Sequence, residues 1–230
     1  MLVQKVTIIV PVKDEEVGLK FLVEDFQSSG IANLYEVEFI FVIDERTSDN
    51  SREIARIFSN EIIDQKDTHG KGAAIKQALE HWMKKPISTV VMLDADGSYS
   101  FKGVIDVLKA LDGNQEVVSG SRFLENRQLD GMSNIHIFGN RFLSRVSSIR
   151  NGRKITDVCT GLWCFEPAAL KKIKITSNGF DLEAQLSGQV RKSGLSHLEV
   201  PIEWSQRKGG VSKLRSIRDG FLILFRILIT

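Results

Sequence analysis

Residues 89–97 read Thr89-Val90-Val91-Met92-Leu93-Asp94-Ala95-Asp96-Gly97, an apolar run that leads directly into two aspartates. A continuous apolar run of this length is typical of a strand that is covered on both faces, as in a parallel sheet. In an open α/β sheet, ligands bind outside the carboxyl ends of the strands. This segment therefore predicts an α/β fold and also the edge of the sheet where its chemistry lies.

Strands and helices alternate on either side of this segment. Further strands are predicted at 6–10, 37–43, 61–63 and 116–119, and helices at about 14–26, 51–58, 72–83 and 101–111. Such alternation implies a mainly parallel central sheet flanked by helices, with right-handed crossovers. The second half is less regular, with helices predicted at 135–149 and 180–192 and strands at 161–165 and 198–201. No internal repeat or low-complexity linker separates the halves, so we expect one shared core.

Composition excludes several classes of protein. The chain has 230 residues, 42% of them apolar and 26% charged, which is typical of a globular domain. Its net charge of +2 is too balanced to indicate a nucleic-acid-binding protein. Cys159 and Cys164 are five residues apart, and in a strand an odd separation would point them to opposite faces, so they are expected to be free thiols of a reducing compartment. Neither a secretion signal nor an apolar run of about 18 residues is present, so we expect a cytoplasmic protein without a membrane span.

Acidic side chains follow three of the predicted strands. Asp14-Glu15 comes after the first strand, Asp44-Glu45 after the second, and Asp94-Ala95-Asp96 after the fourth. Because the carboxyl ends of parallel strands meet at one edge of a sheet, we expect these carboxylates to line one crevice. A single acidic strand end would be explained by a turn or a helix cap, but three at corresponding positions favour a binding site.

The Asp94-Ala95-Asp96 segment is the candidate metal site. Mg²⁺ and Mn²⁺ prefer carboxylate oxygen, and one or two carboxylates with substrate phosphates commonly complete their coordination. The alternative for an isolated Asp-X-Asp is a plain turn. Its position directly after a buried strand, with a glycine following, favours the metal site.

Three basic segments are candidates for binding phosphate. Lys71 lies between glycines at the start of a predicted helix, where backbone N–H groups favour anions. Arg122 follows the fifth strand, and Arg207 and Lys213 belong to a glycine-rich loop at 207–213. Each alone could be an ordinary turn or solvated loop. The four histidines lack zinc-ligand spacing, and no hydrolase nucleophile motif is present.

Taken in order, these motifs resemble those of family 2 glycosyltransferases of the GT-A (Rossmann-like) fold. The matching segments are 10–15, 44–49, 70–74, 94–97, 120–122 and 157–161. The segment 201–214 is similar to that of the dolichyl- or polyprenyl-phosphate mannose or glucose synthases of archaeal type. The resemblance covers residues 6 to about 220. It implies a membrane-associated enzyme of protein glycosylation that uses a nucleotide sugar and a divalent cation, Mn²⁺ or Mg²⁺.

The resemblance also implies roles for individual residues. Asp94 and Asp96 are expected to bind the metal and the donor diphosphate, with Asp96, Arg122 and Arg207 as the catalytic residues. The other donor-binding residues are expected to be Pro11, Asp14, Glu15, Asp44 and Lys71. The acceptor phosphate is expected to be bound by Arg122, Arg207, Ser212 and Lys213. Glu183 matches an acidic position of the family, but no role is assigned to it.

The predicted reaction is inverting transfer of a hexose, with mannose from GDP-mannose as the first choice, to dolichyl or polyprenyl phosphate. The departures from the family's usual residues at 13, 14, 45 and 46 leave UDP-glucose or UDP-N-acetylglucosamine as an alternative donor. Ser98 stands where many members have a metal-contacting Gln, which gives Asp96 a larger share of the metal. A sugar or glycolipid hydroxyl is an alternative acceptor, and it would require a base such as Asp157 or Glu183. A non-catalytic nucleotide-sugar-binding module is a further alternative. Nucleotidyl transfer is disfavoured, because no glycine-rich loop follows the first strand.

The C-terminal segment predicts an interfacial helix. Apolar residues recur at helical spacing from Leu214 to Leu228, and Lys213, Arg215 and Arg218 lie at its start. This pattern is typical of a helix lying on anionic headgroups. The sequence thus predicts a catalytic domain at 1–212 and an amphipathic helix at 213–230 that holds the protein on the cytoplasmic face of the membrane. The alternative is a helix packed on the domain or at the interface of a homodimer.

Overall fold

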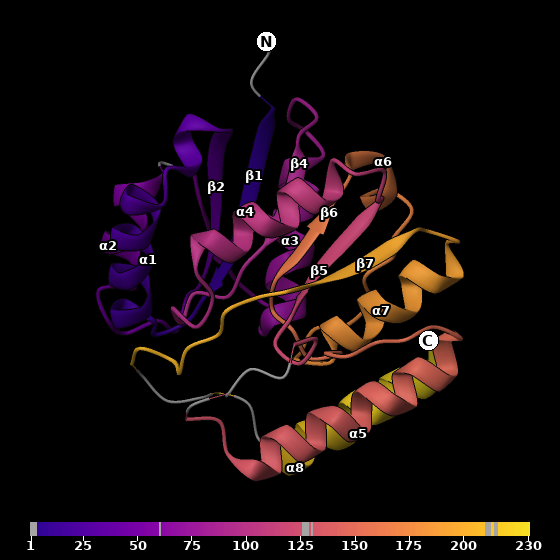
Figure 1. Ribbon diagram of the computed structural model, residues 1–230. Coiled ribbons are helices and arrows are strands. Elements are labelled where there is room, and N and C mark those ends of the chain that lie inside the picture. Colours follow the sequence, from indigo (N-terminus) through magenta and orange to yellow (C-terminus); the bar gives the residue numbers. More distant parts are fainter. Residues whose placement is uncertain (1–3, 60, 126–128, 130, 210–212, 214–215) are drawn as a thin grey trace.

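One sheet extends through both halves of the chain (Figure 1). The computed structural model describes residues 4–59, 61–125, 129, 131–209, 213 and 216–230. Within them the sheet has seven strands in the order β3-β2-β1-β4-β6-β5-β7. Their bounds are β1 Lys5–Val12, β2 Glu36–Asp44, β3 Ile62–Gln65, β4 Thr89–Met92, β5 Val117–Ser121, β6 Trp163–Phe165 and β7 His197–Pro201. Both halves of the chain therefore contribute strands to the same sheet.

The sheet is mainly parallel, as predicted. β1 pairs in parallel with β2 and β4, β2 with β3, and β5 with β7. Only β6 runs the other way, between β4 and β5, in the described part of the sheet. It joins the strands of the first half of the chain to β5 and β7, and its Cys164 lies between Val91 and Val118.

Helices cover both faces of the sheet. On one face lie α1 (Glu16–Ser29), α2 (Ser51–Phe58) and α4 (Phe101–Leu111), packed on Ile8 and Val10 of β1. On the other face, α3 (Lys71–Trp82), α6 (Pro167–Leu170) and α7 (Leu182–Lys192) pack on the intervening Ile9. β1 therefore supplies side chains to two cores in alternation, as expected for a strand covered on both faces.

A pair of helices lies beyond α7. The helices α5 (Asn134–Asn151) and α8 (Ser216–Ile229) run side by side, and α8 also contacts α7 (Figure 1). A small cluster that includes Leu143, Ile223 and Ile227 holds them together. No described helix is both long and apolar enough to cross a bilayer. Cys159 and Cys164 are both free, as predicted.

The predicted elements correspond closely to the observed ones. The helix predicted at 72–83 spans Lys71–Trp82, and the strand predicted at 161–165 is the three-residue β6. The one-turn helix α6 and the 3₁₀ turn η1 (Ile31–Asn33) were not predicted. Both are too short to give a hydrophobic period.

Candidate active site

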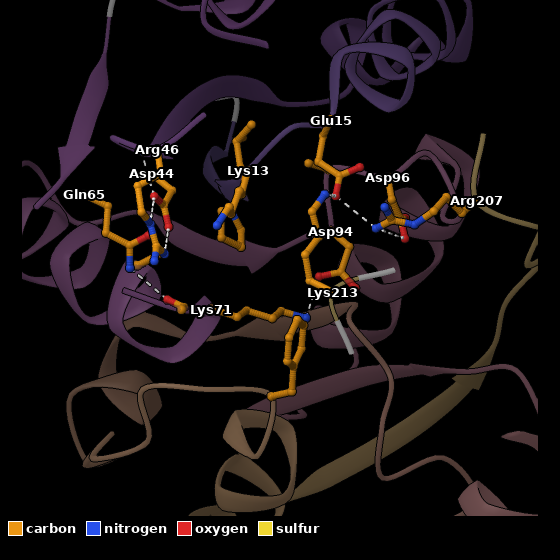
Figure 2. A pocket seen from close by; sticks show the side chains of 16 residues that line it. Lys13, Glu15, Asp44, Arg46, Gln65, Lys71, Asp94, Asp96, Arg207 and Lys213 are labelled. Atoms are coloured by element: carbon orange, nitrogen blue, oxygen red, sulfur yellow. Dashed lines mark hydrogen bonds and ion pairs between the residues drawn. The ribbon is translucent and has the colours of Figure 1, made fainter. Parts of the chain in front are cut away.

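A pocket of about 280 Å³ opens at the carboxyl edge of β1, β2 and β4. The expected crevice of acidic strand ends is therefore present, and the side chains that line it come from both halves of the chain (Figure 2). The lining residues are Pro11, Val12, Lys13, Glu15, Asp44, Arg46, Gln65, Gly70, Lys71, Ala74, Asp94, Ala95, Asp96, Phe180, Arg207 and Lys213.

One end of the pocket is built around Asp44, the last residue of β2. The guanidinium of Arg46 donates to both of its oxygens, with Nε at 2.8 Å from Oδ1 and Nη2 at 2.5 Å from Oδ2. This fork-like pairing outweighs burial and lowers the pKa of Asp44 to about 2. His69 Nδ1 lies 3.4 Å from Asp44 Oδ2. Asp44 is thus an anion fixed in position at neutral pH.

Lys71, the first residue of α3, lies between two carboxylates. Its Nζ is 2.5 Å from Asp94 Oδ1 and 2.5 Å from Glu183 Oε1 on α7. Burial alone would lower the pKa of Lys71, but the two carboxylates raise it above its ordinary value, so the ammonium is charged. Burial raises the pKa of Glu183 in spite of this partner. Lys71 therefore lines the pocket as a cation, and its ion pair with Glu183, which does not line the pocket, fixes its position.

Asp94 is closely packed. A Cβ added to Gly161 would lie 2.1 Å from Asp94 Oδ2, so a larger residue there would have to displace this carboxylate. The N–H of Gly161 donates to the hydroxyl of the buried Tyr99 at 2.8 Å, which keeps this backbone in place. The segment that precedes β6 thus forms one wall against the carboxylate of Asp94.

Asp96 is oriented by its own chain and by the 204–209 segment. The backbone N–H and the hydroxyl of Ser98 both donate to Asp96 Oδ1, at 3.0 and 2.6 Å. Arg207 Nη2 lies 3.3 Å from Asp96 Oδ2 and also donates to Glu15 Oε1 at 2.9 Å (Figure 2). Ser98 therefore positions the Asp96 carboxylate.

The 204–209 segment is fastened along the loop that follows β4. Ser205 N–H donates to Ser98 O at 3.1 Å, and Lys208 N–H donates to Asp96 O at 3.1 Å. Lys213 Nζ donates to Glu15 Oε1 at 2.8 Å. Two of the basic residues predicted to bind phosphate, Arg207 and Lys213, therefore meet on one carboxylate at the pocket.

Arg122 is not among the residues that line the pocket. Its Nε donates to Asp157 Oδ2 at 2.6 Å and its Nη2 to Asp157 Oδ1 at 2.8 Å. Asn140 donates to the same carboxylate at 2.7 Å, and the Asp157 side chain is fully buried. The structure does not bring Arg122 together with Arg207 and Lys213, and its contact with an acceptor stays a prediction.

Asp14 is not among the residues that line this pocket, but it lines a second pocket that shares Glu15 and Lys213 with it. Asp14 has a φ of 47°, and its carboxylate accepts a hydrogen bond from the N–H of Ser48 at 2.8 Å. Ser212 lies outside the described residues. The remaining predictions, Pro11, Glu15, Asp44, Lys71, Asp94, Asp96, Arg207 and Lys213, all line the pocket.

Eight lining residues had no predicted site role, and those with long polar or aromatic side chains are Lys13, Arg46, Gln65 and Phe180. Gln65 ends β3, so the rule that placed the acidic strand ends also applies to it. It donates to the carbonyl of Gly70 at 2.8 Å and so supports the loop before α3. No sequence signal points to Phe180, which reaches the pocket from the segment before α7.

The profile of glycosyl transferase family 2 matches residues 7–174, which is more than half of the chain and spans every strand end of the pocket. The chain belongs to glycosyl transferase family 2. This glycosyltransferase is 28% identical over 223 residues to glycosyltransferase AglJ of Haloferax volcanii, covering 96% of this chain and 70% of the relative.

Two further relatives carry more specific names. Polyprenol monophosphomannose synthase of Mycolicibacterium smegmatis is 26% identical, over 63% of this chain and 56% of its own length. A UDP-N-acetylglucosamine–dolichyl-phosphate N-acetylglucosaminyltransferase of Methanococcus voltae is 22% identical, over 96% of this chain and 94% of its own.

Solved structures confirm the GT-A-like fold. Glucosyl-3-phosphoglycerate synthase of Mycobacterium tuberculosis superposes with a TM-score of 0.75 at 14% identity, covering 98% of this chain and 79% of that one. The same synthase with Mn²⁺, UDP-glucose and phosphoglyceric acid gives a TM-score of 0.73 at 16% identity, covering 99% and 81%.

Proposed function

We propose that this glycosyltransferase moves one hexose from a nucleotide-diphosphate sugar to the phosphate of a polyprenyl or dolichyl lipid, with inversion at the anomeric carbon. One observation favours a phosphate acceptor. The pocket gathers Lys71, Arg207 and Lys213, whereas neither candidate base lines it. Asp157 is fully buried on Arg122, and Glu183 is paired with Lys71. A sugar hydroxyl would require such a base.

A divalent cation fits the described site through Asp94 and Asp96. Both carboxylates line the pocket, and Ser98 already orients one of them. No group of three or more His, Cys, Asp or Glu suited to a metal occurs among the described residues, so the remaining ligands would be water and donor phosphate. Mg²⁺ and Mn²⁺ are commonly bound in this way, and the solved synthase with Mn²⁺ and UDP-glucose shares the fold. When bound, the cation would neutralise charge that develops on the leaving diphosphate.

The transfer is a single in-line displacement. An oxygen of the acceptor phosphate forms a bond to the anomeric carbon as the bond from that carbon to the donor diphosphate breaks, through an oxocarbenium-like transition state. A phosphate monoester has its second pKa near ~6, so it is already an anion at neutral pH. Lys71, Arg207 and Lys213 then hold two anionic partners beside each other, which a base cannot do.

Mannose from GDP-mannose is our proposed donor pair. The polyprenol monophosphomannose synthase supports mannose, whereas the Methanococcus voltae relative is named for UDP-N-acetylglucosamine. A thermal-shift series with GDP-mannose, UDP-glucose and UDP-N-acetylglucosamine, each with Mn²⁺, separates these donors. We expect GDP-mannose to give the largest shift and to yield mannosyl polyprenyl phosphate by product mass. A larger shift and a product only with a UDP sugar would overturn the choice of donor.

We further propose that the pair α5–α8 holds the enzyme on the membrane. Apolar side chains on both helices are strongly exposed: Ile135 77%, Phe138 76% and Ile149 77% on α5, and Ile217 81%, Phe221 70% and Phe225 60% on α8. Exposed arginines accompany them at 141, 145, 150 and 218, and Asp219 is the one acid in the two helices. Apolar side chains flanked by arginines fit the acyl boundary and headgroups of an anionic bilayer.

Vesicle flotation tests this docking surface. In the full chain, Phe138→Glu with Phe221→Glu should weaken binding to anionic vesicles by on the order of a hundredfold, because burying one Phe side chain contributes about 1.5–3 kcal/mol. The matched control is Ile57→Glu with Ile87→Glu, two positions of similar exposure (67% and 66%) away from the pair. Unchanged flotation of the first variant would refute the surface. A change only in its sedimentation coefficient would assign the helices to a homodimer instead.

A further inference from the structure

The two aspartates proposed to hold the cation are already neutralised by the protein. Lys71 Nζ lies 2.5 Å from Asp94 Oδ1, and Arg207 Nη2 lies 3.3 Å from Asp96 Oδ2. These two carboxylates are two residues apart and face the same pocket. Without a positive charge nearby they would repel each other. Lys71 and Arg207 therefore supply the positive charge that a divalent cation would supply to these two aspartates.

Each of these cations has a second carboxylate behind it. Glu183 Oε1 lies 2.5 Å from Lys71 Nζ, and Glu15 Oε1 lies 2.9 Å from Arg207 Nη2. Both glutamates are buried, with side chains only 7% and 8% exposed. If an aspartate were released, each cation would remain attached to its glutamate. Each would therefore stay at the pocket with a donor group left over for another anion.

We infer that Lys71 and Arg207 are exchangeable counter-ions of Asp94 and Asp96. The inference rests on the proposed function. The divalent cation takes their place on the two aspartates, and the donor diphosphate accepts the released ammonium and guanidinium. Glu183 is a positioning residue that keeps Lys71 at the pocket throughout. Glu183 thus has a role in the site although it contacts neither the divalent cation nor the donor diphosphate.

Exchange of this kind couples the two ligands. The cation alone must displace Lys71 and Arg207 without giving them a new partner, which costs free energy. A nucleoside diphosphate supplies that partner, so it should tighten Mn²⁺ binding beyond the direct contact between metal and phosphate. By linkage, Mn²⁺ must tighten nucleotide binding by the same factor, typically about 5–150-fold for coupled sites.

Two substitutions should shift this coupling in opposite directions. In Lys71→Met, Asp94 loses its internal counter-ion, so Mn²⁺ alone should bind on the order of tenfold more tightly and the coupling should shrink. In Glu183→Gln, Lys71 loses its second anchor and pairs more exclusively with Asp94. Mn²⁺ alone should then bind more weakly, while the coupling should grow. A merely structural role would weaken binding in both variants alike.

The measurement is the free Mn²⁺ signal in electron paramagnetic resonance, titrated with and without GDP or UDP. Lys85→Met is the matched control, because Lys85 also bridges two carboxylates, Glu38 and Glu61, away from the pocket. We expect wild-type coupling in this control. Circular dichroism melting confirms that each variant is folded, and Glu183→Gln remains informative if Lys71→Met does not fold.

The outcomes separate this inference from the proposed function. Shifts of opposite sign in the two variants support the exchange. Nucleotide-dependent Mn²⁺ binding that is unchanged in both variants, or weakened in both, overturns the exchange and leaves the proposed function standing. Absence of any Mn²⁺ or nucleotide binding to the wild-type chain overturns both.

Discussion

Gly161 determines where the carboxylate of Asp94 can lie. A Cβ at this position would come within 2.1 Å of Asp94 Oδ2, so Gly161→Ala must push the carboxylate away from its place beside Lys71. A displacement of about 1 Å at a reacting site can cost on the order of a hundredfold in rate. We therefore expect Gly161→Ala to reduce sugar transfer by about a hundredfold and to weaken Mn²⁺ binding.

Gly139 on α5 supplies the control for this prediction. No atom lies within 4 Å of a Cβ built there, and the helix interior favours alanine by about 0.5–1 kcal/mol. Gly139→Ala should therefore transfer sugar at the wild-type rate and melt at the same or a slightly higher temperature. Equal activity of the two alanine variants would show that Asp94 does not need its observed position.

Strand-end residues were predictable from sequence because the sheet fixes where a strand ends. Asp44, Asp94 and Asp96 lie at the pocket for this reason. Asp14 follows a strand too, but its φ is 47° and its carboxylate accepts from Ser48, which the sequence did not indicate; its contact with the donor stays a prediction. The ion pair of Lys71 with Glu183 also could not be foreseen. It depends on how α3 meets α7, two helices that are far apart in the chain.

At the scale of elements, β5 and β7 share a partly buried histidine. His197 Nε2 and the hydroxyl of Ser119 form a 2.9 Å hydrogen bond, and the imidazole stacks on Trp163 with centroids 5.4 Å apart. Loss of solvent around the imidazole lowers the pKa of His197 from its ordinary 6.5 to about 3, and the charge of Arg153 adds to this. The unfolded chain therefore takes up a proton that the folded chain excludes between these two values.

This difference predicts how stability depends on pH. The contribution of His197 is complete above about pH 6.5 and is lost as the pH falls toward 3. Between pH 7 and pH 5, wild-type protein should lose about 2 kcal/mol more unfolding free energy than His197→Phe, which keeps the ring stack but cannot titrate. Urea denaturation at both pH values measures this. The same pH dependence in both proteins would contradict a neutral His197 in the folded state.

The longer elements were predictable and the short ones were not. Apolar runs in β1, β2 and β4 indicated buried strands, since both faces of the sheet are covered. The direction of β6 was not indicated, because three residues carry no pattern that distinguishes parallel from antiparallel pairing. The apolar surface of α5 was also missed. Its Phe138 and Ile149 resemble core residues in sequence, and only the fold leaves them exposed.

At the scale of the whole molecule, the pocket is formed by residues from both halves of the chain. Strands β1, β2 and β4 bring the acidic groups, and the 204–213 segment brings Arg207 and Lys213 from the far end of the sequence. Of the proposed membrane-facing pair α5–α8, the helix α8 begins three residues after Lys213 in the chain. If α8 lies on the membrane as proposed, the phosphate of a lipid at headgroup level would be close to Lys213.

Transfer to a matched pair of lipids tests the central claim most directly. The wild-type enzyme, with Mn²⁺ and a radiolabelled nucleotide sugar, is given either a polyprenyl phosphate or the same polyprenol without phosphate, and Asp96→Asn is assayed beside it. We predict labelled lipid only from the phosphate, and a loss of at least about a hundredfold in Asp96→Asn. Equal labelling of the unphosphorylated polyprenol, or near-normal transfer by Asp96→Asn, would contradict a cation-bound donor attacked by a lipid phosphate.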